Sequence, residues 1–116
     1  FLKSEVRLAL SSDFATSPFS PLVQIADAVF RESPTGLYDG SWYPEQALSF
    51  EQALYAYTQV GADLAGWGEK IGSISVGKYA DFVILDQTLS NPVGRELKSI
   101  KVAKTYFAGQ LVYSQN

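Results

Sequence analysis

The chemistry open to this chain is limited by the side chains it contains. Its 116 residues include no histidine and no cysteine, so a Ser–His pair, a thiolate nucleophile and a Cys-ligated metal are excluded. A hydrolytic zinc centre needs about three protein ligands and a bound water. Without imidazole only carboxylates remain, and these suit harder cations better than zinc. The acids are spread along the sequence without a carboxylate pair, so the chain supplies at most part of such a centre.

One carboxylate follows a short apolar run. Val6 to Leu10 is apolar except for Arg7, and Ser11-Ser12-Asp13 comes directly after it. The pattern predicts a strand whose C-terminal end carries Asp13. Taken alone, Asp13 is expected to accept backbone N–H groups in a turn, as Asp commonly does.

Composition indicates a globular chain with enough residues for one domain and a modest core. Apolar residues make up 47% and charged residues 18%, which is too apolar for a disordered chain. The net charge of −3 argues against a nucleic-acid partner. The basic cluster is predicted to be a solvated face; it consists of Arg95, Lys98, Lys101 and Lys104. No apolar run approaches the length of a membrane span, and the glycines do not have phosphate-loop spacing.

The most informative stretch is Ile71 to Asp86, IGSISVGKYADFVILD. Gly72 and Gly77 can adopt backbone angles closed to other residues, which makes each a plausible turn point. Phe82 to Leu85 is too short for a core helix and is rich in β-formers, so it predicts a buried central strand. Asp81 and Asp86, which flank this strand, are interpreted as turn or capping residues.

These spaced positions resemble the C-terminal signature of the amidohydrolase superfamily. The matching residues are Gly72-Ser73-Ile74, Gly77-Lys78, Ala80-Asp81-Phe82 and the strand that ends on Asp86. Ser12-Asp13 and the proline-containing segment after it are similar to the family, particularly to its third amidohydrolase group. The run Ala53-Leu54…Tyr57-Thr58 is similar to a helix that precedes the signature in the family. The signature lies away from the metal in that family and identifies it without supplying the chemistry.

The resemblance implies an α/β fold class: a C-terminal fragment of a (β/α)8 metal-dependent hydrolase barrel, with part of an accessory small β-domain. Residues 1–70 would hold the last barrel strand and the C-terminal helices, and residues 71–116 the C-terminal part of the β-domain. The absence of methionine and histidine fits this expectation of a piece of a larger protein.

For chemistry, the resemblance implies that Asp13 is a metal ligand and a proton carrier. The cofactor would be a divalent metal ion, expected to be zinc, in the full-length protein only and not in this fragment. The implied function is hydrolysis of a non-peptide carbon–nitrogen bond in a small-molecule substrate, with the fragment itself inactive. The alternative is a non-catalytic regulatory or interaction module that keeps an amidohydrolase-like sequence.

The expected partners and compartment follow from the same considerations. We expect no nucleic-acid partner and no membrane association. Strand edges that lack their neighbours make self-association possible. The absence of cysteine fits a cytoplasmic protein.

Helical periodicity appears twice. Ser20 and Pro21 suit the cap and first position of a helix that stops before Pro34. Its buried face is predicted to be Leu22, Ile25, Ala26, Val29 and Phe30. A second helix begins at Ser49, where Ser49 and Gln52 form a capping-box pattern. Its apolar stripe is predicted to be Phe50, Ala53, Leu54, Tyr57 and Leu64.

The remaining segments are predicted to be loops and a hairpin. Glu32 to Gln46 is a loop rich in large apolar and aromatic residues, which we expect to cover apolar surface rather than to form a substrate lid; they are Leu37, Tyr38, Trp42 and Tyr43. Gln87 to Glu96 is a second loop. Lys101–Phe107 and Gln110–Tyr113 around Ala108-Gly109 predict a hairpin, with a bulge at Lys104 because alternation breaks there.

Overall fold

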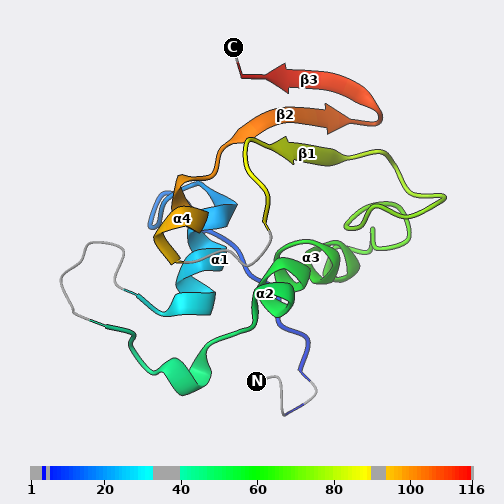
Figure 1. Ribbon diagram of the computed structural model, residues 1–116. Coiled ribbons are helices and arrows are strands. Elements are labelled where there is room, and N and C mark those ends of the chain that lie inside the picture. Colours follow the sequence, from blue (N-terminus) through cyan, green and yellow to red (C-terminus); the bar gives the residue numbers. More distant parts are fainter. Residues whose placement is uncertain (1–3, 5, 33–39, 90–93, 116) are drawn as a thin grey trace.

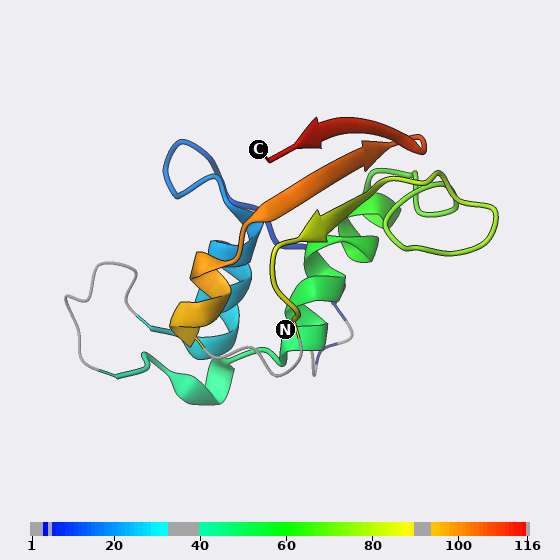
Figure 2. The same ribbon diagram turned by 45° about the horizontal axis from the view of Figure 1, so that its top comes forward.

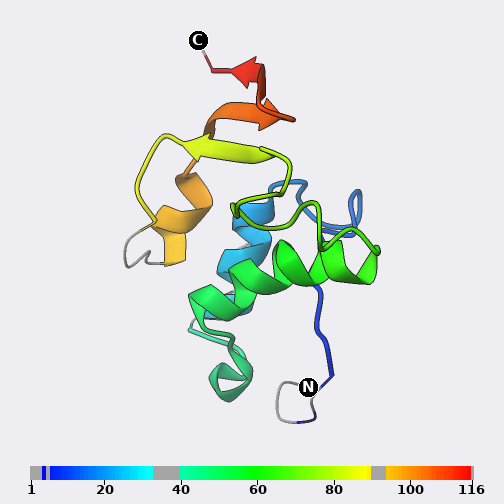
Figure 3. The ribbon, with the colours of Figure 1, turned by 90° about the vertical axis from the view of Figure 1, so that its right-hand side faces the viewer.

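The computed structural model describes residue 4 and residues 6–32, 40–89 and 94–115. Its elements, in chain order, are α1 (Pro21–Phe30), the short 3-10 helix η2 (Pro44–Gln46), α2 (Phe50–Tyr57), α3 (Gln59–Leu64), β1 (Phe82–Leu85), α4 (Gly94–Ser99), β2 (Val102–Phe107) and β3 (Gln110–Ser114). The sheet lies on one side of the molecule and the helices on the other, as the views in Figure 1 and Figure 3 show.

Helix α1 forms where the periodicity predicts it. Pro21 occupies the first turn and Ser20 has extended backbone angles at the cap, although its hydroxyl makes no cap hydrogen bond. Ile25 and Ala26 are buried, and the other predicted apolar residues pack around them. Asp27 on this helix forms an ion pair with Lys98 at 2.6 Å.

The capping box of the second helix is confirmed. The Gln52 N–H donates to the Ser49 hydroxyl at 3.1 Å, and the Ser49 N–H donates to the Gln52 side chain at 2.9 Å. A backbone N–H, and then the Ser49 hydroxyl, hydrogen-bond the Glu51 carboxylate and hold its pKa below the usual value. The stability that these hydrogen bonds add is fully present above the pKa that Glu51 has in the unfolded chain. It is lost as the pH falls through the lower pKa that Glu51 has in the folded chain.

The prediction of one continuous second helix is wrong. Thr58 has φ −116° and ψ −83°, which ends α2 and separates it from α3. The Thr58 hydroxyl donates to the Leu54 carbonyl at 2.8 Å, a local bond that competes with the helix ladder. Leu64, assigned to the apolar stripe, is 52% exposed because it belongs to the separate helix α3.

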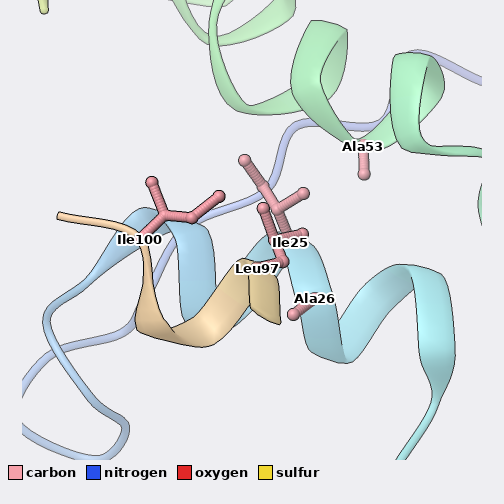
Figure 4. Close-up of a cluster of buried hydrophobic side chains, with 5 residues drawn as sticks. All are labelled: Ile25, Ala26, Ala53, Leu97 and Ile100. Carbon is pink, nitrogen blue, oxygen red and sulfur yellow. The ribbon is translucent and has the colours of Figure 1, made fainter. Parts of the chain in front are cut away.

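The core is a small cluster between α1, α2 and α4. Figure 4 shows Ile25 and Leu97 side by side, with Ala26, Ala53 and Ile100 around them. Helix α4 corrects the sequence prediction, which had a loop from Gln87 to Glu96 and no helix before the hairpin. This helix is short and starts at a glycine, so its propensity is weak; burial of Leu97 against α1 stabilises it instead.

The three strands form one antiparallel sheet in the order β1-β2-β3. The hairpin around Ala108-Gly109 is confirmed. The register shift in β1–β2 pairs Ile84 with Lys104 and Leu85 with Val102, so the extra residue is Ala103, beside the predicted bulge at Lys104. A second shift lies between Thr105 and Tyr106.

The prediction that Phe82–Leu85 is a buried central strand is wrong for this chain. Strand β1 lies at an edge of the sheet, and Val83 and Ile84 are 50% and 44% exposed. An apolar run of this kind suits a strand covered on both faces, and the described residues do not provide that cover.

Both acids that flank β1 bind backbone groups at the ends of β2, which confirms their capping role. The Ala108 N–H donates to the Asp81 carboxylate at 2.7 Å, and the Lys101 N–H donates to the Asp86 carboxylate at 2.9 Å. These bonds fix the pairing of β1 with β2 on either side of the bulge.

Two further expectations are corrected. Val6 to Leu10, predicted to be a strand, belongs to no ladder among the described residues, so it has no neighbouring strand to pair with here. Trp42 and Tyr43 do not cover apolar surface here; they are 69% and 52% exposed and contact each other with ring centroids 5.7 Å apart. Leu37 and Tyr38 lie outside the described residues.

The sheet edges predict self-association. Every residue of β3 is exposed, and the strand carries no charge or proline, the features that usually block edge pairing. We expect sedimentation velocity to show concentration-dependent association of the unchanged chain, and Val112→Lys to reduce it. Gln46→Lys, which adds the same charge outside the sheet, is the matched control. Equal association of both variants would contradict edge pairing.

Candidate active-site segment

Asp13 lies in a tight turn with its side chain exposed. Its φ of 48° is in the left-handed region, which Asp tolerates better than most residues. The Thr16 N–H donates to the Asp13 backbone carbonyl at 2.8 Å. The turn bond is therefore accepted by the main chain and not by the carboxylate, which differs from the interpretation of Asp13 as a side-chain turn acceptor.

Neighbouring elements hold the segment that carries Asp13. The Leu10 N–H donates to the Ala56 carbonyl on α2 at 3.1 Å, and Leu10 packs on the edge of the core. After the turn, Phe14 and Phe19 meet edge to face at 5.5 Å. The Gln24 amide on α1 donates to the Ser17 hydroxyl at 3.0 Å. Together with the Leu10–Ala56 bond, this contact attaches the segment to the helical layer both before and after the turn.

The described residues do not by themselves fit a divalent metal ion. Among them, no group of three acidic, histidine or cysteine side chains comes together. Several acids already have other partners: Asp27 binds Lys98, Asp63 binds Gln59, and Asp81 and Asp86 bind backbone groups. Asp13, the ligand that the family resemblance implies, therefore joins no cluster of three such side chains among the described residues, and we derive no chemical step through a metal.

A large open groove runs between the helices and the sheet, with a volume of about 1550 Å³. Leu22, Leu54 and Tyr57 line its helical side, and Val83 and Tyr113 line the sheet side. Figure 2 shows the three strands lying above the helical layer. Asp13 does not line the groove, and its lining carboxylate, Asp81, already accepts a backbone N–H. The groove is an apolar surface and does not define the reactive site.

A family model described as amidohydrolase family matches residues 1–113. The chain belongs to the amidohydrolase family. The resemblance drawn from the Ile71–Asp86 signature is confirmed, and the family extends over the helices and the Asp13 segment as well.

Curated relatives align over nearly the whole chain. The chain is 37% identical to Protein LONG AFTER FAR-RED 3 of Arabidopsis thaliana over 97% of its own length and 19% of that protein. It is 33% identical to N-substituted formamide deformylase of Arthrobacter pascens, over 98% of the chain and 20% of that protein. The chain thus spans about a fifth of these curated relatives.

Solved amidohydrolase structures share the fold of this piece. The guanine deaminase of E. coli superposes with a TM-score of 0.71 at 25% identity, covering 98% of the chain and 29% of that structure. An amidohydrolase from Thermotoga maritima MSB8 gives 0.68 at 27% identity, covering 98% of the chain and 24% of that structure. The small mixed α/β arrangement therefore occurs within larger amidohydrolases. Over the part of the chain that the structure describes, no helix is long and apolar enough to cross a membrane.

The lack of a cluster of three possible ligands among the described residues predicts weak metal binding by the 116-residue chain. Titration with zinc in a calorimeter should show no stoichiometric tight binding, since about three protein ligands are needed. Asp13→Asn should leave that result unchanged. Stoichiometric binding with the affinity of a structural zinc site would contradict the ligand assignment.

Proposed function

We propose that this chain is the C-terminal part of a metal-dependent amidohydrolase that hydrolyses a non-peptide carbon–nitrogen bond in a small molecule. The observation that carries the proposal is the family match over residues 1–113. The names of two relatives describe reactions at such bonds: N-substituted formamide deformylase and, at 31% identity over 85 residues, a probable guanine deaminase of Schizosaccharomyces pombe.

In this proposal, the helical part and the sheet part of the chain belong to two different domains of the larger protein. Residues 1–70 would contribute the last strand of a (β/α)8 barrel and the helices after it, and residues 71–116 would contribute part of an accessory β-domain. The run Val6–Leu10 supports this view, since it is held next to α2 by the Leu10–Ala56 bond and has the composition of a strand. Active sites of such barrels lie at the carboxyl ends of the strands, where Asp13 would then lie.

Asp13 would act as the proton carrier of the reaction. A carboxylate within reach of the attacking water can take its proton and later deliver it to the leaving nitrogen. Two features of this chain support that role: the side chain is exposed, and the left-handed turn is closed by the main chain instead of the carboxylate. The divalent metal implied by the family, expected to be zinc, would lower the pKa of a bound water, with other ligands supplied upstream of this chain.

A variant of the longer protein tests this role. Asp13→Asn keeps the size and polarity of the side chain and removes its basicity, so we expect turnover to fall by about two to four powers of ten. The fold, followed by circular dichroism, should be unchanged. Glu45→Gln, at another exposed acid, is the matched control and should keep full activity. Turnover of Asp13→Asn close to that of the control would remove Asp13 from the mechanism.

The second candidate function is a non-catalytic regulatory or interaction module. The observation that favours it is the 37% identity to Protein LONG AFTER FAR-RED 3, whose name states no reaction. The two functions differ in the residues they require before this segment. An upstream His-x-His after a strand supports the enzyme, and a barrel without those histidines supports the module.

A further inference from the structure

The loop from Lys70 to Tyr79 is closed at its base and pressed against α3. The Tyr79 N–H donates to the Lys70 carbonyl at 2.8 Å, which joins the two ends of the loop. At Gly72 the backbone has φ +93°, and an added Cβ would lie 2.7 Å from the Ala62 Cβ on α3 and 3.0 Å from the Gln59 Cα. Only glycine allows the main chain to approach the helix this closely.

Lys78 connects the same loop to the same helix through its side chain. Its ammonium donates to the Gln59 side-chain carbonyl at 2.8 Å and to the Ile71 backbone carbonyl at 3.1 Å. The Gln59 amide in turn donates to the Asp63 carboxylate at 2.7 Å. One cation thus joins both ends of the loop to α3, and a carboxylate on the helix is linked to it through a glutamine.

This arrangement differs from that of an ordinary surface lysine. Lys78 is half-buried, and its two acceptors are neutral oxygens, one on the Gln59 side chain and one on the main chain at Ile71. Lys70, in the same loop, is exposed and has its ammonium 5.6 Å from the Trp67 ring centre. Hydrogen bonds from a charged donor are stronger than neutral ones, so Lys78 can determine where the loop lies.

We infer that Lys78 is a positioning residue that fixes the Lys70–Tyr79 loop to α3 and thereby sets where the sheet begins relative to the helices. The loop leads directly to Asp81, which binds the Ala108 N–H at the end of β2. The segment is therefore attached to α3 on one side and to the hairpin on the other. Its exposed tip, with Ile74 and Val76 at 86% and 108% exposure, has no part in this attachment.

Amide hydrogen exchange of the 116-residue chain, measured residue by residue, tests the inference. Lys78→Met keeps the length and apolar stem of the side chain and removes the donor. We expect exchange of the Tyr79 amide to accelerate by about tenfold to a hundredfold, the range for loss of a charged hydrogen bond. Amides that pair β2 with β3 should change by less than about twofold, because the two Lys78 hydrogen bonds go to Gln59 and Ile71 and not to that hairpin. Lys70→Met is the matched control and should leave Tyr79 exchange unchanged.

A second pair of variants separates this role from general destabilisation. Gln59→Leu removes the acceptor on α3 and should accelerate Tyr79 exchange as Lys78→Met does. The double variant should exchange no faster than the faster single variant, because both changes remove one shared contact. An unchanged Tyr79 amide in both single variants, or multiplicative effects in the double variant, would overturn the inference. If Lys78→Met unfolds the whole chain, Gln59→Leu decides alone: faster Tyr79 exchange with a protected hairpin supports the role, and any other result overturns it.

Discussion

The packing of α4 against α1 is the contact on which the rest of this chain depends. It brings Leu97, which is completely buried, against Ile25 from an early part of the sequence. Each such side chain contributes about 1.5–3 kcal/mol when removed from water. The Lys98–Asp27 ion pair beside them has side chains that are 21% and 25% exposed, and solvent screening reduces such pairs to about 0–1 kcal/mol. The apolar contact therefore supplies the stability, and the ion pair orients α4 on α1.

This contact also determines where the sheet lies. Strand β2 follows α4 after the buried Ile100, so the start of β2 is held close to the core. The start of β1 is held separately by the loop attached to α3. With the sheet anchored at these two places, a wide apolar groove remains between it and the helices. The helices pack mainly on one another and not on the sheet, as would be expected if each layer normally has other neighbours.

The sequence predicted the elements whose signals are local. Ser49 and Gln52 specify a helix start by their own hydrogen bonds, and Ala108-Gly109 specifies a turn by its backbone preferences. It did not predict α4, because the stability of that helix comes from Leu97 meeting α1, a contact between distant parts of the chain. For the same reason it placed Lys98 on a solvated face, and it gave no signal that Lys78 and Gln59 would meet. The exposure of β1 was also not predictable. An apolar sequence indicates that a strand is normally packed against other elements, but it does not indicate whether those elements are part of the same chain.

For the candidate site, the sequence predicted one residue, Asp13, and did not predict the arrangement of the groups around it. Asp13 was singled out by its place after an apolar run and by the family resemblance, and both concern position along the chain. The turn that leaves its carboxylate exposed depends on a left-handed backbone at Asp13 and a bond from the Thr16 N–H, which the sequence does not specify. The proposed function therefore depends on groups that must approach this carboxylate from elsewhere in a longer protein.

The most direct measurement is a crystal structure of the longer protein, with the metal located by anomalous scattering. The central claim, that Asp13 belongs to the metal centre of an amidohydrolase, predicts a carboxylate oxygen of Asp13 at about 2.0–2.2 Å from the ion. A metal bound elsewhere, with Asp13 facing solvent or held in a turn, would contradict it.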